Sequence, residues 1–338
     1  METSLLGPDT VTRLTDIEDV VRTVESAFAA HARGRSIMPA KSYVELPAYS
    51  GDVRSMPVYL DIHPEDGPAE DAWDAAAVKW VNVHPDNPAD HDLPTVMGTI
   101  IYTDPETGFP LSVMDGTTIT RLRTGAAAAV ATKYLASEDA TSLGLVGAGR
   151  QAYTQLEAIA TVREIDRVVV SDRRSVAAQA LVDHFADRFD VREGPIEEAA
   201  TCDVVSTTTP VEEPIVHAVG ERTHLNAIGA DAAGKHEISD EVLTESRIVI
   251  DDHEQCTHSG EINVPYSDGT LTDADIDAEL GDVVAGNVAG RTDGDGVTLF
   301  DSTGLAIQDV AAAHVVYERA REAGVGDRYE LVDTDPGR

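Results

Sequence analysis

The sequence contains little cysteine, little lysine, few aromatic residues and no long hydrophobic segment. Only two cysteines, Cys202 and Cys256, occur in 338 residues, which excludes a disulfide framework and favours a reducing, cytoplasmic environment. No run of about eighteen apolar residues is present, so we expect no membrane span. The first residues show no basic segment followed by an apolar one, so we expect no secretory signal.

The charge is strongly acidic. There are 61 Asp and Glu residues against 25 Lys and Arg residues, which gives a net charge of −36. Such a surface is a poor partner for nucleic acid, and a hydrophobic content of 42% argues against disorder. We expect a halophilic protein, because salt screens the repulsion between acidic side chains. Only four of the basic residues are lysines, namely Lys41, Lys79, Lys133 and Lys235. We expect such a chain to keep lysine mainly where an ammonium group is chemically needed.

The chain is organised around a glycine-rich stretch near its middle. The apolar run at 143–146 predicts a buried strand, and a helical pattern begins after Gly147-Ala148-Gly149. In this context Gly-x-Gly-x-x-Ala, which ends at Ala152, predicts a dinucleotide-binding turn. Gly147 would permit the tight turn and Gly149 would let the backbone approach a pyrophosphate, which the helix N-terminus would also attract. The alternative is a tight turn without a ligand.

A second predicted strand, at 167–172, ends in Asp172, where a carboxylate would hold the ribose 2′-hydroxyl of NAD. Arg173 and Arg174 keep NADP open as an alternative. Strand and helix patterns then alternate to about residue 251, which predicts a doubly wound parallel sheet. Ligands bind beyond the carboxyl ends of such strands, so residues 207–210 and 229–231 should lie around the same crevice as Asp172.

The segments on either side predict a second, α+β domain. Helix signals cover 15–33, with Thr15 as the N-cap and Gly34 after the end. A long helix to about residue 323 should be capped by 301–304 and return to the first domain. The domains are therefore expected at 1–120 with 302–338, and at 121–301. The remaining expected elements are strands at 51–60, 75–83, 95–102 and 109–114, an acidic surface loop at 61–74, and a connecting helix at 117–136.

Several polar residues are candidates for chemistry. Lys79 is flanked by Ala, Val and Trp, so its ammonium should be desolvated and its pKa lowered, which suits proton transfer. The alternative is a solvated lysine on an alternating strand. Arg54 and Lys41 could bind a carboxylate or be surface charges, and Arg123 could be a helix arginine whose charge reaches solvent. Asp231 could orient water or a substrate amine, or could form a turn.

No metal site is predicted. The histidines show no His-Glu-x-x-His spacing, and Asp251-Asp252-His253-Glu254 fits the polarity of a loop better than a ligand set.

Ten short motifs together resemble the ornithine cyclodeaminase/μ-crystallin family, most closely its alanine dehydrogenase branch. The match covers nearly the whole chain. The motifs are MPAK at 38–41, GDVRSMP at 51–57, VKWVN at 78–82, LPTVM at 93–97, ETGFP at 106–110, LRTG at 122–125, GAGRQAY at 147–153, NAIGAD at 226–231, GEIN at 260–263 and FDSTGLAIQD at 300–309. The acidic stretch at 61–74 is longer than the branch's usual connection.

The resemblance implies a homodimer with an N-terminal substrate-binding and dimerisation domain, completed by the C-terminal helix, and a central Rossmann domain. It implies NAD-dependent oxidative deamination of L-alanine, with Lys79 as acid/base and Asp231 beside the reacting centre. Arg54 and Arg123 would lie near the substrate carboxylate or the nicotinamide, and Lys41 would be a further substrate-binding residue. The resemblance also implies a set of NAD contacts: Arg123, Gly147, Gly149, Arg150, Gln151, Asp172, Thr207, Thr208, Thr209, Ile228, Gly229, Ala230, Asp231 and Ser302.

Other members of the family leave three alternatives for function. One is ornithine cyclodeamination to proline and ammonia, and another is reduction of a cyclic ketimine. A third, of a different class, is a μ-crystallin-type protein that binds NAD(P)H and a small ligand without turnover. The presence of Lys41, Arg54, Lys79 and Asp231 argues against a purely binding role.

Overall fold

The computed structural model describes residues 1–67 and 72–335 and divides the chain into two compact units. The first unit consists of Met1–Arg123 and Ala306–Arg338, and the second of Thr124–Leu305. The division falls within helix α4 (Gly116–Leu135). The sequence therefore correctly predicted a helix that connects the two parts of the chain.

The first unit contains an eight-stranded mixed sheet. Its order is β16-β1-β7-β6-β5-β4-β2, and β3 pairs with β4. All neighbours are antiparallel except β1 and β7. The strands are β1 (Thr3–Leu6), β2 (Ser36–Ile37), β3 (Ser42–Leu46), β4 (Gly51–Ile62), β5 (Trp73–Val83), β6 (Val96–Thr103), β7 (Pro110–Asp115) and β16 (Asp327–Tyr329). The four strands predicted here correspond to β4–β7.

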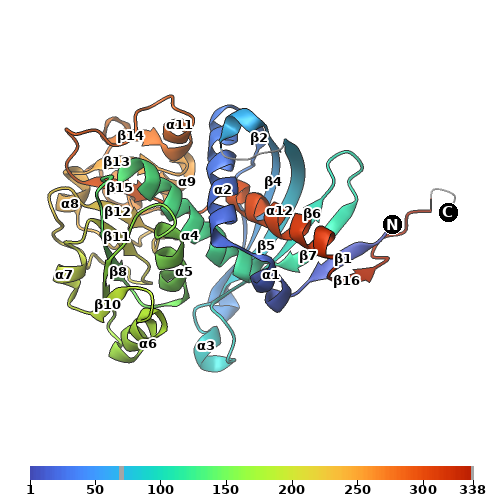
Figure 1. Cartoon of the computed structure of the whole chain (residues 1–338), viewed down its shortest axis with the longest axis horizontal. Helices are drawn as coiled ribbons and strands as arrows, with labels where there is room; N and C mark the ends of the chain where they lie inside the picture. Colours follow the sequence, from blue (N-terminus) through green and yellow to red (C-terminus); the bar gives the residue numbers. More distant parts are fainter. Residues whose placement is uncertain (68–71, 336–338) are drawn as a thin grey trace. The chain divides into compact units, whose positions relative to one another are not determined.

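Two long helices cover one face of this sheet. Helices α2 (Ile17–Ala32) and α12 (Ala306–Ala323) pack on each other, and both contact β4 (Figure 1). Beneath them, alternate residues of β4, from Met56 to Ile62, are buried. Because side chains alternate across a strand, Lys79 and Val81 of β5 lie on the same covered face. Helix α12 thus belongs to the first unit. The shorter helices are α1 (Pro8–Leu14) and α3 (Asn87–Asp90).

The start of α2 differs from the predicted one. Asp16 is the N-cap, and its carboxylate accepts a hydrogen bond from the Glu18 amide at 3.0 Å. Thr15 instead ends α1, where its hydroxyl donates to the Val11 carbonyl at 2.6 Å. The prediction was wrong because α1 was not recognised, and its last turn uses the threonine. Gly34 follows α2 with a φ of 72°, as expected of a glycine after a helix.

The predicted acidic surface loop is wrong in part. Strand β4 extends to Ile62 and β5 begins at Trp73, and a 3₁₀ turn (Pro64–Asp66) lies between them. The Asp66 side chain is buried, because Arg33 and Arg35 both pair with it, at 2.7 and 2.9 Å. Residues 68–71 of the predicted loop lie outside the described residues.

The second unit is built on an eight-stranded parallel sheet, as predicted. Its order is β10-β9-β8-β11-β12-β15-β13-β14. The strand order reverses between β8 and β11, so the crevice beyond their carboxyl ends is where such a sheet binds ligands. The strands are β8 (Ser142–Val146), β9 (Arg167–Ser171), β10 (Asp190–Glu193), β11 (Val204–Thr207), β12 (His224–Ala227), β13 (Arg247–Ile250), β14 (Ile276–Glu279) and β15 (Thr298–Asp301).

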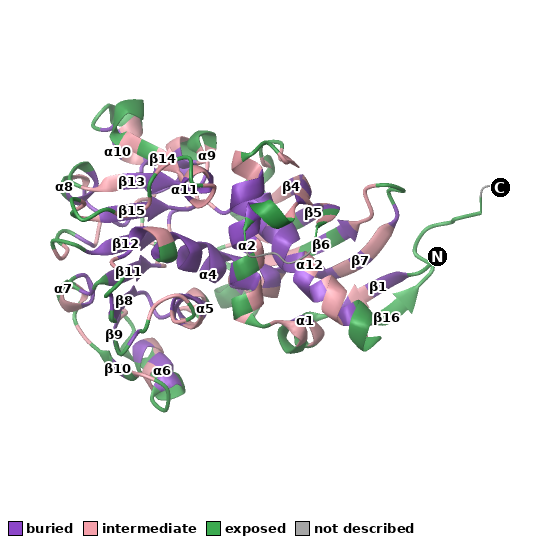
Figure 2. Cartoon of the chain, turned by 45° about the horizontal axis from the view of Figure 1, so that its top comes forward, coloured by how far each residue is buried: buried purple, intermediate pink, exposed green. Residues whose placement is uncertain are grey.

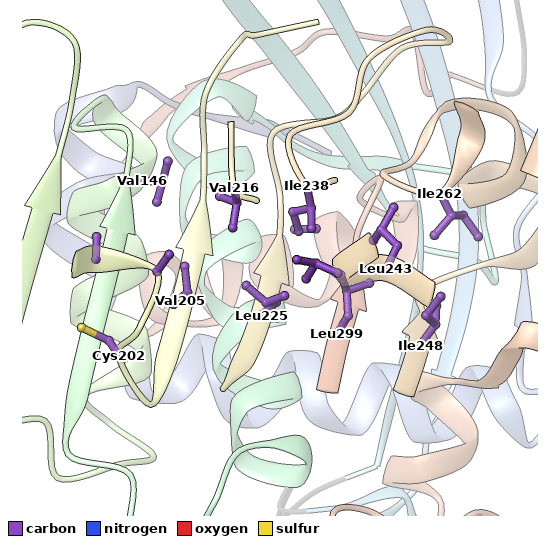
Figure 3. Close-up of a cluster of buried hydrophobic side chains, with 14 of the residues drawn as sticks. Val146, Cys202, Val205, Val216, Leu225, Ile238, Leu243, Ile248, Ile262 and Leu299 are labelled. Carbon is purple, nitrogen blue, oxygen red and sulfur yellow. The ribbon is translucent and has the colours of Figure 1, made fainter. Parts of the chain in front are cut away.

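The central strands of this sheet are buried on both faces (Figure 2). One face carries a cluster that includes Val146, Val205, Leu225 and Leu299, which lie side by side on neighbouring strands (Figure 3). Near-continuous apolar strands are typical of parallel sheets that are covered on both sides. The helices of this unit are α5 (Arg150–Ile159), α6 (Ser175–Phe185), α7 (Ile196–Ala199), α8 (Asp240–Thr244), α9 (His253–Ser259), α10 (Asn263–Asp268) and α11 (Leu280–Val284).

The expected capping of the C-terminal helix by residues 301–304 is wrong at Asp301. Asp301 is the last residue of β15 and is fully buried. Its carboxylate accepts hydrogen bonds from the amides of Glu261 and Ile262, at 2.9 and 3.2 Å. The chain then passes through residues 302–305 before α12 begins at Ala306.

Candidate active site

Lys79 is buried in the middle of β5, on the sheet face that the helices cover. Its side chain is only 2% exposed, whereas its neighbour Trp80 points to the other face and is 53% exposed. The ammonium Nζ lies 2.6 Å from Oδ2 of Asp309, in the first turn of α12, and 3.3 Å from Oγ1 of Thr120. The desolvation predicted for Lys79 is confirmed, and the solvated alternative is wrong.

Burial changes the acidity of Lys79. Its pKa falls from 10.5 to about 7, chiefly because burial disfavours the charged form. The carboxylate of Asp309 opposes this shift, while the charges of Arg123 and Lys41 add to it. An amine with a pKa near neutrality can both accept and release a proton under ordinary conditions.

Arg123 shares the carboxylate of Asp309. Its Nε lies 3.1 Å from Oδ1 of Asp309, and its Nη1 donates to Oε1 of Gln308 at 2.9 Å. Arg123 is nearly fully buried, so its interpretation as a helix arginine that reaches solvent is wrong. The sequence did not single out Gln308 or Asp309. The available signal was their position as a polar pair at the start of an otherwise Ala- and Val-rich helix.

Arg54 lies on the same face of the sheet as Lys79. Met56 pairs with Lys79 in the β4–β5 register, so Arg54, two residues before Met56, is a diagonal neighbour of Lys79. The guanidinium of Arg54 makes two hydrogen bonds to Asp52, at 2.7 and 3.0 Å. Lys41 directly precedes β3 and is close enough to affect the pKa of Lys79. The first unit thus gathers three cationic side chains, Lys41, Arg54 and Arg123, around Lys79, with carboxylates at Asp309 and Asp52.

The glycine turn of the second unit has the geometry expected for a nucleotide. Gly147 has a φ of 101°, and a Cβ there would lie 2.9 Å from Oγ1 of Thr208, so the position requires glycine. Gly149 is the N-cap of α5, and a Cβ on it would meet no atom within 4 Å. The backbone at Gly149 is therefore open to an approaching group, beside the unpaired N–H groups of a helix start.

Asp172 follows β9 and lies against this turn. One carboxylate oxygen accepts a hydrogen bond from the Ala148 amide at 2.8 Å, and the other accepts from the Arg174 amide at 2.8 Å. The structure thus places Asp172 beside the glycines, as the motif predicted. The open backbone at Gly149 and the carboxylate of Asp172 fit the pyrophosphate and the ribose of a dinucleotide.

The remaining predicted nucleotide contacts lie near the carboxyl ends of strands in the same sheet, except for Arg150 and Gln151 in the first turn of α5. The Ile228 amide donates to the Thr207 carbonyl at 3.1 Å, and the Ser302 amide donates to the Ala227 carbonyl at 3.1 Å. Thr208, Thr209, Gly229 and Ala230 follow β11 and β12. Asp231 lies in this unit and forms an ion pair with Lys235 at 3.1 Å.

In residues 1–67 and 72–335, no group of three or more His, Cys, Asp and Glu side chains is arranged to hold a metal ion. In the same ranges, no helix is long and apolar enough to cross a membrane. The interpretation of 251–254 as a polar loop is wrong, because His253 and Glu254 begin helix α9 and Asp251 is buried. Its carboxylate accepts hydrogen bonds from the Gly304 amide and the Ser302 hydroxyl, at 2.8 and 3.2 Å.

A parallel sheet with a glycine turn after β8 and a carboxylate after β9 defines a Rossmann-type domain, here accompanied by a second domain with a buried lysine. A family model described as "Ornithine cyclodeaminase/mu-crystallin family" matches residues 1–324. The chain belongs to this family.

Among characterised relatives, the chain is similar to an alanine dehydrogenase of Archaeoglobus fulgidus. The two are 46% identical over 334 residues, which is 98% of this chain and 99% of the relative. A solved archaeal alanine dehydrogenase dimer with bound NAD has a TM-score of 0.91 at 46% identity, and the match covers 98% of this chain and all of that one. The Δ¹-pyrroline-2-carboxylate reductase of Thermococcus litoralis, solved with NADH and L-proline, has a TM-score of 0.89 at 34% identity, with 96% and 99% covered.

Proposed function

We propose that this protein is an NAD-dependent dehydrogenase that converts L-alanine to pyruvate and ammonium, reversibly. The observation that carries the proposal is Lys79, a buried amine with a pKa of about 7 among cationic side chains. The similarity to alanine dehydrogenases over nearly the whole chain supports alanine as the substrate. The pyrroline-carboxylate reductase is less similar in sequence.

The first unit would bind the amino acid. Arg54 and Lys41 would bind its carboxylate, because a guanidinium and an ammonium pair well with carboxylate oxygens. Arg123 is held by Asp309 and Gln308 and would add positive charge nearby. In its neutral form, Lys79 would take a proton from the substrate ammonium, which must become an amine before the α-carbon is oxidised.

The second unit would bind NAD, which when bound supplies the acceptor for the hydride of the α-carbon. Gly147 and Gly149 would receive the pyrophosphate, and Asp172 the adenosine ribose. Arg173 and Arg174 are compatible with some use of NADP, but a carboxylate at 172 disfavours the 2′-phosphate by charge repulsion. After oxidation, water would hydrolyse the imine to pyruvate and ammonium, with Lys79 or Asp231 orienting the water.

A homodimer is also part of the proposal. The sheet face opposite α2 and α12 carries apolar side chains that these helices do not cover, among them Val78, Trp80 and Ile101, the last two exposed at 53% and 39%. Exposed apolar patches of this kind mark interaction surfaces, and the similar archaeal structure is a dimer. Trp80→Asp should therefore convert a dimer to a monomer in sedimentation, while Ser50→Asp, at a turn, should not.

The decisive experiment is to mix purified protein in molar KCl with NAD and one amino acid, and to follow the absorbance of NADH. L-Alanine should produce NADH and pyruvate. NADH that forms with L-proline but not with alanine would favour a pyrroline-carboxylate reductase. Proline and ammonia from L-ornithine, without net NADH, would identify a cyclodeaminase. Binding of NADH without turnover of any of these would favour the binding-protein alternative.

A further inference from the structure

Three buried carboxylates form a series at the carboxyl ends of the strands in the second unit. Asp301, Glu261 and Glu237 are each fully buried. Asp301, at the end of β15, accepts hydrogen bonds from the amides of Glu261 and Ile262. Glu261 then accepts from the amides of Glu237 and Ile238 through one oxygen, at 2.7 and 2.6 Å. Each carboxylate thus fixes the backbone that carries the next one.

The series ends on two loops of the predicted nucleotide site. One oxygen of Glu237 accepts hydrogen bonds from the amide and the hydroxyl of Thr209, at 2.8 and 2.6 Å. The other accepts from the Gly229 amide at 3.0 Å. The loop after β11 and the loop after β12 are therefore tied together through one side chain.

Close packing at Gly229 shows that this contact is tight. A Cβ on Gly229 would lie 2.2 Å from Oε2 of Glu237 and 2.6 Å from the Thr209 carbonyl, so no larger residue fits. Burial raises the pKa of all three carboxyl groups, to about 7 for Asp301. Burying a carboxyl group is costly unless the group is hydrogen-bonded, and a buried network of satisfied hydrogen bonds makes the surrounding backbone rigid.

We propose that Asp301, Glu261 and Glu237 are positioning residues that hold the loops at Thr209 and Gly229 in the conformation that binds the nicotinamide nucleotide. The inference rests on the proposed NAD site and deepens it, since no carboxylate of the series is assigned a contact with the cofactor. Glu237 acts on both loops directly. Glu261 and Asp301 act through the backbone that carries Glu237.

Glu237→Gln tests the last link. Both oxygens of Glu237 are acceptors, so an amide nitrogen in place of either one would face an N–H or O–H donor. A buried donor that is left without its acceptor corresponds to about a tenfold or larger loss in an equilibrium constant. We therefore expect the Kd for NADH, measured by calorimetry, to rise about tenfold, and the KM for NAD to rise more than kcat falls.

Glu261 tests transmission, because its carboxylate accepts hydrogen bonds from the amides of Glu237 and Ile238 rather than from Thr209 or Gly229. Glu261→Ala removes the acceptor of two backbone amides and should weaken NADH binding about as much as Glu237→Gln. Glu261→Gln keeps an amide oxygen in that place and should restore most of the affinity. Asp203→Asn is the matched control: its carboxylate accepts from the Thr141 and Ser142 amides at the opposite, amino end of β8.

A melting temperature measured for each variant separates positioning from general destabilisation. The proposal is overturned if Glu237→Gln binds NADH as the unmodified protein does, or if Asp203→Asn weakens NADH binding equally at the same loss of melting temperature. Should Glu261→Ala fail to fold, Glu237→Gln still decides the question. An unmodified protein that does not bind NADH would overturn the proposed cofactor, and this inference with it.

Discussion

The pH dependence of turnover is the sharpest consequence of the pair Lys79–Asp309. If neutral Lys79 accepts the substrate proton, kcat/KM should rise with pH and reach half its maximum near pH 7, where the pKa of Lys79 lies. Below that pH the lysine is an ammonium and cannot accept the proton. The acid side of the profile therefore reports the protonation of Lys79.

Asp309→Asn should move this half-maximum to lower pH. Two unit charges 2.6 Å apart interact by about 6 kcal/mol at an effective dielectric constant of about 20, which is an upper limit. Neighbouring opposite charges usually shift a pKa by about one to three units. With the carboxylate removed, Arg123 and Lys41 still disfavour the ammonium, so we expect the half-maximum to fall by about two pH units.

The assay measures kcat/KM for L-alanine as a function of pH, at saturating NAD in molar KCl. A range of about five units, from about pH 5 to about pH 10, covers the expected shift of the half-maximum. Asp52→Asn is the control, because Asp52 pairs with Arg54 in the same unit, at 2.7 Å, whereas the carboxylate that pairs with Lys79 is Asp309. The control variant can lower the height of the profile but should leave its half-maximum in place. A half-maximum that stays near pH 7 in Asp309→Asn would refute the assignment of this proton to Lys79.

Three further predictions follow from the two units. Lys79→Met should abolish turnover yet leave NADH affinity intact. It should not lower the melting temperature at pH 7, because a lysine whose pKa is lowered by burial costs stability in full below about pH 7, and this cost disappears only as the pH approaches the ordinary value of 10.5; strong destabilisation would contradict this. Gly149→Ala should fold normally, since its Cβ meets no atom within 4 Å, but should weaken NADH binding by about tenfold if a pyrophosphate approaches there. The unfolding midpoint in denaturant should rise from dilute to molar KCl, given a net charge of −36; a midpoint independent of KCl would remove the case for halophily.

The sequence was most informative about the second unit. Its strands are short apolar runs separated by helices, a pattern in which local periodicity and burial agree. The glycine turn was predictable because Gly147 must adopt a positive φ, which few other residues tolerate. In the first unit, β1, β16 and α1 were missed. They are short, and their pairing depends on contacts between the two ends of the chain.

Site residues could be predicted where their neighbours in the sequence indicate burial. They could not be predicted where the site forms from segments that are distant in the sequence. Lys79 could be placed inside because its own neighbours are apolar. Asp309 could not be assigned as its partner, because only the folded sheet brings α12 over β5. The burial of Asp66, Asp251 and Asp301 was missed for a related reason. Acidic residues in turns predict exposure, whereas each of these is buried by hydrogen bonds from elsewhere in the chain.

The distribution of lysine connects composition to mechanism. Lys79 is buried and titrates near neutrality, and Lys235 pairs with Asp231. Lys133, by contrast, is exposed and lies over the ring of Tyr134, so lysine is not confined to sites that need an ammonium. Arginine cannot replace the buried lysine, because a guanidinium stays charged at any physiological pH. A chain that uses arginine for most of its positive charge must therefore still keep a lysine wherever the proton acceptor is a side-chain amine.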